Sequence, residues 1–281
     1  AVNSPHILQV SGVGPSDHLI NIGINVVHHL PGVGANLQDH YVARVSHRVR
    51  HAKSINSLSR GTNLLKEIAT WAFSGKGALT FGVTSAMVFS RSREGLSSPD
   101  LQLLFTPASY SERTLGKLEQ EDGMTVAVCP VRPASRGTIM AVSSDPFVRP
   151  EIRPNYLSDP DDVRVLLAGI HQTREIFSQP ALQRYSSKET APGIQIQTSE
   201  ELENFARNNG SIIYHPVSTC RMGDDEMAVV DPRLRVHGIK GLRVVDASIM
   251  PTVTTGNTNA PTIMIAEKAS DMILEDARHA A

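Results

Sequence analysis

The side chain with the clearest chemical potential is a histidine inside the segment YHPVSTCRMG, residues 214–223. This residue, His215, precedes Pro216, whose ring fixes the backbone just beyond it. An imidazole with an ordinary pKa of about 6.5 can accept a proton near neutral pH, which suits a general base. From this spacing alone, a structural role for the histidine is the simpler alternative.

A polar loop with two amide side chains lies near the C-terminal end, in TTGNTNAP, residues 254–261. Gly256 permits a close approach of the backbone, and Asn257 and Asn259 offer donors and acceptors directly before a predicted helix. A helix start carries unpaired N–H groups and partial positive charge, so it can stabilise an anion. The alternative is that Asn259 or Thr258 only caps this helix.

A third candidate is the carboxylate of Asp246, which ends the β-branched segment LRVVD. This pattern predicts a strand, and ligands gather at the carboxyl ends of strands in open α/β sheets. The position therefore favours a cofactor role, although an acid there can also simply close a turn.

Composition and spacing argue against several other functions. Lys and Arg number 27 against 28 Asp and Glu, so we expect no nucleic-acid partner. The absence of an apolar run of 18 residues predicts no integral membrane segment. Cys129 and Cys220 form no CxxC pair, which indicates neither a disulfide framework nor a cysteine zinc site. His28 and His29 have no further ligands nearby, so no metal site is predicted.

These candidates need a framework of helices and strands to position them. Periodicity predicts helices at residues 16–22, 54–73, 161–177, 198–208 and 261–276. It predicts strands at residues 101–105, 124–131, 137–143 and 242–246. The expected buried stripe of the last helix comprises Ile263, Met264, Ala266, Ala269, Met272 and Ile273. The mixture argues for one antiparallel sheet covered by helices in the middle of the chain.

Taken together, the motifs resemble the glucose–methanol–choline (GMC) oxidoreductase family. NSPHILQVSGVGP, residues 3–15, looks like the family's second signature, and LPGVGANLQDH, residues 30–40, is similar to the segment that follows it. PASRGTIMAVSSDP and NYLSDPDD resemble the substrate-domain sheet region. YHPVSTCRMG and residues 229–273 look like the C-terminal signature. The last block is most similar to the choline dehydrogenase and bacterial alcohol dehydrogenase branch.

The resemblance implies a mixed α+β and α/β fold in three segments. Residues 1–40 are expected to be the C-terminal segment of the FAD-binding region and residues 41–220 the substrate-binding domain, with an antiparallel sheet and helices. Residues 221–281 would return to the FAD-binding domain and end in a helix. The family's N-terminal GxGxxG, which holds the FAD diphosphate, has no counterpart here. We therefore expect roughly half of a full-length member to be absent from this sequence.

The reaction implied by the resemblance is FAD-dependent oxidation of an alcohol to an aldehyde or ketone. Hydride would pass to flavin N5 while His215 acts as the base toward the substrate hydroxyl. Asn257 falls where family members carry a second His or an Asn, and it would hydrogen-bond the substrate oxygen.

The resemblance also places five residues at the FAD. Asp246 and Ala247 would lie along the ribityl–pyrophosphate chain. Asn259, Pro261 and Thr262 would lie near the pyrimidine side of the flavin ring, whose reduced form is anionic there.

The implied partners are a small-molecule alcohol and an electron acceptor, either oxygen or a quinone. We expect a cytoplasmic location, with peripheral attachment to a membrane left open. Two alternatives remain: an inactive fragment or substrate-domain module without bound FAD, and a hydroxynitrile-lyase-like member of the same fold. A metal-dependent hydrolase that uses the histidines is a third, with little in the sequence to support it.

Overall fold

The structure, a computed structural model, describes residues 1–111 and 116–280. The chain forms two compact units. Unit 1 comprises Ala1–His40, Val131–Pro160 and Ile212–Ala281, and unit 2 comprises Tyr41–Pro130 and Asp161–Ser211. The chain therefore passes from unit 1 to unit 2 twice and returns twice.

These units divide the chain differently from the expected segments. The boundary after His40 coincides with the expected one, but residues 131–160 and 212–220, expected in the middle segment, group with unit 1. One cause is the buried side chain of Gln9, whose Nε2 donates to Ile139 O at 3.0 Å and whose Oε1 accepts from Ala141 N at 2.6 Å. The FAD-binding and substrate-binding roles of the segments remain predictions.

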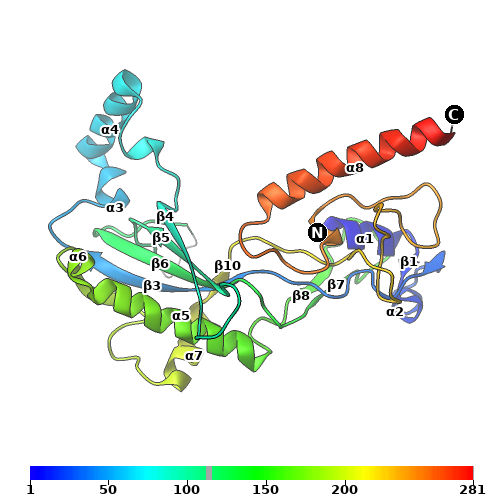
Figure 1. The fold of residues 1–281 in the computed structure, drawn as a ribbon, viewed down its shortest axis with the longest axis horizontal. Coiled ribbons are helices and arrows are strands. Elements are labelled where there is room, and N and C mark those ends of the chain that lie inside the picture. Colours follow the sequence, from blue (N-terminus) through cyan, green and yellow to red (C-terminus); the bar gives the residue numbers. More distant parts are fainter. Residues whose placement is uncertain (112–115, 281) are drawn as a thin grey trace. The chain divides into compact units, whose positions relative to one another are not determined.

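Unit 2 is built on an antiparallel sheet with the strand order β10-β3-β6-β5-β4, and β9 also pairs with β3 (Figure 1). The strands are β3 (Tyr41–Val49), β4 (Ala86–Ser90), β5 (Leu101–Thr106), β6 (Gly123–Pro130), β9 (Ser186–Ala191) and β10 (Ser211–Ile212). The expected strands at β5 and β6 are confirmed, and both are largely buried, as their continuous apolar runs require. Sequence periodicity missed β3, β4, β9 and β10.

Helix α5 (Pro160–Ser178) lies along one face of this sheet (Figure 1). Its buried side chains recur at helical spacing, which confirms the helix expected at residues 161–177. At Gly169 the helix packs tightly against the sheet. A Cβ atom there would lie 2.4 Å from Val128 Cγ1 and 2.9 Å from Leu101 Cδ2, so the missing side chain lets α5 pack against β5 and β6.

The remaining helices of unit 2 are α3 (Ile55–Leu58), α4 (Gly61–Ser74), η1 (Ala78–Thr80), α6 (Pro180–Gln183) and α7 (Ser199–Asn209). The single helix expected at residues 54–73 is wrong in detail, because Arg60 is extended and separates α3 from α4. Helix α7 confirms its prediction: the Thr198 hydroxyl caps it, and Glu201 completes a capping box. Tyr41 on β3 anchors α7 by donating to Ala206 O at 2.8 Å.

Unit 1 combines short strands with helices. Its elements are α1 (Asn3–Val10), β1 (Val13–Gly14), α2 (Ser16–Asn21), β2 (His28–His29), β7 (Thr138–Met140), β8 (Glu151–Arg153), η2 (Ala247–Ile249) and α8 (Asn259–Ala280). Strands β1 and β2 are parallel, and β7 and β8 are antiparallel. The expected helix at 16–22 is confirmed by α2, and β7 covers only residues 138–140 of the strand expected at 137–143.

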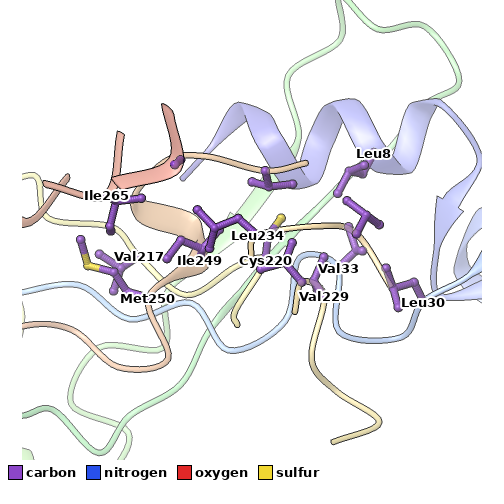
Figure 2. Close-up of a cluster of buried hydrophobic side chains, with 14 of the residues drawn as sticks. Leu8, Leu30, Val33, Val217, Cys220, Val229, Leu234, Ile249, Met250 and Ile265 are labelled. Carbon is purple, nitrogen blue, oxygen red and sulfur yellow. The ribbon is translucent and has the colours of Figure 1, made fainter. Parts of the chain in front are cut away.

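A buried apolar cluster joins distant parts of unit 1 (Figure 2). Leu8 and Val33 come from the N-terminal segment, Val217 and Cys220 follow His215, and Ile265 belongs to α8. Val244 and Ile249 of the same cluster flank Asp246. Apolar burial therefore fixes the backbone near His215, near Asp246 and in α8.

Two expectations for the C-terminal region are wrong. Residues 242–246 form no strand, because this segment turns back on residues 234–236 and makes a single bridge, between Arg235 and Arg243. Helix α8 buries Ile265 and Ala269 rather than the broad stripe expected, since only a narrow side of it meets the apolar cluster. Exposed fractions on α8 are 54% for Ile263, 59% for Met264 and 43% for Ile273.

Within the described ranges, no helix combines the length and the apolar character needed to cross a membrane.

We predict that Gly169→Ala destabilises the protein by about 1–3 kcal/mol, because the added methyl group overlaps Val128 and Leu101. At a solvent-exposed helix position the same change would stabilise the protein by up to about 1 kcal/mol. The sign of the change in stability therefore tests the packing at Gly169. Urea unfolding followed by circular dichroism measures it. Glu175→Ala, on the exposed side of α5, is the matched control and should change stability by less than about 0.5 kcal/mol. A stabilising Gly169→Ala would contradict the close approach of α5.

Candidate active site

His215 lies in a short extended segment of unit 1 that runs beside Gln38. Gln38 N donates to Val217 O at 3.2 Å, and Val217 N donates to Gln38 O at 2.9 Å. Beyond this pair, Ile213 N donates to His40 O at 3.3 Å. His215 is therefore held by backbone contacts on both sides, and its side chain is buried, with 7% exposure.

The imidazole of His215 contacts a second histidine, His40. The two Nδ1 atoms lie 2.8 Å apart, and the rings meet edge to face with centroids separated by 5.1 Å. His40 is completely buried, and its Nε2 lies 3.3 Å from the carbonyl oxygen of Val131. The two rings share one hydrogen bond, in which one Nδ1 donates and the other accepts.

A buried carboxylate holds the backbone of both histidines. Asp39 Oδ1 accepts from the backbone N–H of His40 and from that of His215, each at 2.8 Å. Its Oδ2 accepts from the Tyr156 hydroxyl at 2.8 Å. Burial raises the pKa of the Asp39 carboxyl, and these three hydrogen bonds oppose that rise.

Burial also controls the charge of both histidines. The pKa of His40 is lowered to about 4, first by burial and then by the charge of His215. Burial lowers the pKa of His215 as well, and the Asp39 carboxylate acts in the opposite direction. Both imidazoles are therefore neutral at neutral pH.

Two neutral rings in this arrangement favour one distribution of protons. The carbonyl of Val131 can only accept, so Nε2 of His40 carries a hydrogen and its Nδ1 is an acceptor. Nδ1 of His215 must then donate to His40, which leaves a lone pair on Nε2 of His215. Among the described residues nothing forms a hydrogen bond with that nitrogen, and it is not fully enclosed. The geometry thus prepares Nε2 of His215 to accept a proton.

The loop that carries Asn257 is attached to the same backbone pair. Val253 N donates to Gln38 Oε1 at 3.2 Å, and Gln38 Nε2 donates to Pro251 O at 3.4 Å. Gly256 adopts a φ of 138°, which favours glycine, and Asn257 follows it with an exposed side chain. The structure thus brings this loop to the segment of His215, while the contact of Asn257 with a substrate oxygen stays a prediction.

Asp246 caps the short helix η2, whose first residue is Ala247. Its Oδ1 accepts from Ser248 N at 2.7 Å and from the Ser248 hydroxyl, and its Oδ2 accepts from the Ser4 hydroxyl at 2.5 Å. Burial favours the neutral acid, whereas hydrogen bonds from Ser248 and Ser4 favour the carboxylate, and the net effect is a lowered pKa. These bonds support the simpler view that Asp246 closes a turn. The predicted positions of Asp246 and Ala247 near FAD stay predictions.

The three other predicted cofactor residues lie in the first turn of α8. The helix begins at Asn259, two residues earlier than expected, and Pro261 occupies its third position. Thr262 N and the Thr262 hydroxyl both donate to Thr258 O, at 3.0 and 2.7 Å. No acidic side chain occurs in this turn, so nothing there opposes the attraction of a helix start for negative charge.

Asp39, His40 and Tyr156 are the residues that sequence reasoning missed. The only signal was the Asp-His pair that ends the segment LPGVGANLQDH. A depression of about 550 Å³ lies between residues 231–243 and Asp276, and it contains none of the predicted site residues. Within residues 1–111 and 116–280, no three His, Cys, Asp or Glu side chains are grouped to hold a metal ion.

Two sequence profiles, both described as GMC oxidoreductase, match this chain. One matches residues 1–42 and the other residues 133–266, which together make up more than half of the sequence. The unmatched stretch between them contains most of unit 2. Both the His40 and the His215 segments fall inside the matched regions.

The chain is also similar to individual proteins. It is 44% identical to an oxygen-dependent choline dehydrogenase of Pectobacterium carotovorum subsp. carotovorum (strain PC1) over 97% of this chain and 49% of that protein. Among solved structures it resembles Aspergillus oryzae RIB40 formate oxidase, with a TM-score of 0.91, 25% identity, and coverage of 99% of this chain and 53% of that one. An FAD-dependent oxidoreductase from Chaetomium thermophilum matches with a TM-score of 0.83, 25% identity, and coverage of 99% and 54%. The chain spans about half the length of these proteins.

The lowered pKa of His40 predicts a loss of stability in acid. Because the folded-state pKa is about 4 and the ordinary value is 6.5, the unfolded chain binds more protons between these pH values. Stability from the buried neutral ring is complete above pH 6.5 and falls by on the order of 3 kcal/mol as the pH drops to 4. His40→Gln removes this titration and should flatten the pH dependence of urea unfolding across that window.

The matched control for His40→Gln is His171→Gln, at an exposed position on α5. The free energy of unfolding of this variant should change with pH as steeply as that of the unmodified protein. Equal slopes in all three proteins would contradict the burial of a neutral imidazole at position 40.

Proposed function

The chain belongs to the GMC oxidoreductase family, and on this premise we propose that it supplies the base for FAD-dependent oxidation of an alcohol to an aldehyde or ketone. The observation that carries the proposal is the contact between His40 and His215, which leaves Nε2 of His215 with a lone pair. The activity belongs to the complete flavoprotein, because the chain spans about half the length of its relatives.

His215 is proposed to remove the hydroxyl proton of the alcohol. A C–H bond next to a hydroxyl gives up its hydrogen with two electrons readily only as the O–H proton leaves, because the oxygen lone pair then forms the carbonyl. Nε2 of His215 would take this proton while Nδ1 keeps its hydrogen bond to His40. The ring becomes cationic in that step, and the carboxylate of Asp39 favours the charge.

Asn257 is proposed to orient the alcohol oxygen. Its amide can donate a hydrogen bond to an oxygen that becomes more negative as the proton leaves. The loop that presents it is fixed by the Gln38 side chain at Val253, four residues earlier. An amide held in advance costs little reorganisation when the charge develops.

The start of α8, with Asn259, Pro261 and Thr262, fits the flavin side of the site in its chemistry, and Asp246 and Ala247 are proposed to lie along the ribityl–pyrophosphate chain. All belong to unit 1, together with His215 and Asn257. The first turn of α8 contains no acidic side chain, and Asn259 is exposed there, so the helix start can accept a neighbouring anion. When bound, FAD would supply the acceptor for the two electrons of the alcohol C–H bond.

The proposed substrate is a small alcohol. Choline is the first to test, because the name of the Pectobacterium relative gives choline as its substrate. That relative's name also includes oxygen, which makes oxygen the first electron acceptor to test and a quinone the second.

We predict that His215→Gln lowers the rate of flavin reduction by an alcohol roughly 10²–10⁴-fold in the complete flavoprotein. Glutamine keeps a polar side chain of similar reach but cannot serve as a base at neutral pH. Stopped-flow bleaching of the oxidised flavin measures the rate, and the flavin content of the purified variant shows whether FAD is still bound. His171→Gln, at an exposed site in unit 2, should reduce its flavin at the unaltered rate. A His215→Gln variant that retains FAD and its full rate would refute the proposed base.

We predict that Asn257→Ala slows flavin reduction roughly 10²–10³-fold, because it removes one donor to the developing negative charge. The pH at which the base titrates should change little, because His215 and its partners remain intact. The pH profile of the reduction rate tests both statements. A rate within a factor of two of the unmodified enzyme would exclude Asn257 from the reaction.

A further inference from the structure

The backbone around His215 departs from a regular antiparallel ladder. In such a ladder, hydrogen-bonded pairs recur every second residue. Since Gln38 and Val217 exchange both of their hydrogen bonds, the next pair would join His40 and His215 by two more. That pair does not form, because the carbonyl of His40 accepts from Ile213 instead.

The local sequence explains this departure. Tyr214 has a φ of 60°, in the left-handed region, so the chain turns just before His215. Pro216 follows His215 and has no N–H group to donate. The turn moves Ile213 into the place that His215 would occupy, and it leaves the N–H groups of His40 and His215 without ladder partners.

The carboxylate of Asp39 takes up both of these N–H groups. Its Oδ1 lies 2.8 Å from the nitrogen of His40 and 2.8 Å from that of His215. Tyr156 donates to the other oxygen, which fixes the plane of the carboxylate, and the Asp39 side chain is buried. One side chain thus replaces the missing ladder pair and holds the two histidines at the same distance from a common atom.

We infer that Asp39 is a positioning residue for the base: it sets the Nδ1 contact between His40 and His215, and through this contact the Val131 carbonyl selects the Nδ1–H form of His215. This contact is possible only while the two backbones stay at the spacing that Oδ1 imposes. The importance of the selection for catalysis rests on the proposed function, whereas the selection itself is a property of this chain.

The experiment is ¹⁵N NMR of the histidine side chains in the 281-residue chain, combined with hydrogen exchange of the backbone amides. In the unmodified chain, we expect the Nε2–H form of His40 and the Nδ1–H form of His215. Asp39→Ala should abolish the ¹⁵N signatures of these two tautomers. It should also speed hydrogen exchange of the His40 and His215 backbone amides about tenfold or more, because both lose a buried acceptor. Asp39→Asn should retain them, because its amide oxygen can still accept both N–H groups and Tyr156 can turn to accept from its NH₂ group.

The matched control is Asp231→Ala. Asp231 Oδ1 also accepts two backbone N–H groups, from Arg233 at 2.8 Å and Arg235 at 2.9 Å, and makes no hydrogen bond to either histidine. It should leave the imidazole signatures unchanged.

Three results would overturn the inference: unchanged signatures in Asp39→Ala, their loss in Asp39→Asn, or their loss in Asp231→Ala. The measurement involves no flavin. A failure of the alcohol-oxidation proposal would therefore appear in the flavin reduction rates and leave this result intact.

Discussion

The candidate site depends on one hydrogen bond between two buried imidazoles. Burial favours neutral rings, and two neutral rings joined through Nδ1 atoms must divide the roles of donor and acceptor. The carbonyl of Val131 decides the division, because an oxygen that can only accept forces the hydrogen of His40 onto Nε2. A backbone carbonyl one ring away from His215 thus determines which of its nitrogens can act as a base.

Other features of unit 1 keep this arrangement in place. Buried glutamines replace regular secondary structure at two points: Gln9 ties the N-terminal helix to the segment around Ile139, and Gln38 ties the loop before Asn257 to its own backbone pair. The apolar cluster in Figure 2 anchors residues that follow His215 and the first half of α8. Hydrogen bonds of these polar side chains therefore fix the positions of the backbone segments. Burial of the apolar cluster supplies most of the free energy that stabilises this arrangement.

The fold class expected from the motifs is confirmed: the protein mixes α and β structure and contains an antiparallel sheet with a helix along one face. Membership in the GMC oxidoreductase family is confirmed by profiles that match residues 1–42 and 133–266. Strong apolar periodicity predicted β5, β6 and α5, because their burial follows directly from residue type. Residues 242–246 show the limit of that logic. A β-branched run becomes a strand only where a partner edge is available, and this segment turns back on itself.

The sequence by itself determined the family, the antiparallel sheet and the identity of His215 as the candidate base, since local motifs and periodicity carry this information. The tertiary structure alone decided the environment of that base. Asp39 and His40 contact His215 across separations of 176 and 175 residues, and Tyr156 contacts Asp39 across 117, so no local pattern records these contacts. The nitrogen that is left to accept a proton follows from those contacts, because a tautomer is set by the partners of the ring and not by its neighbours in the chain.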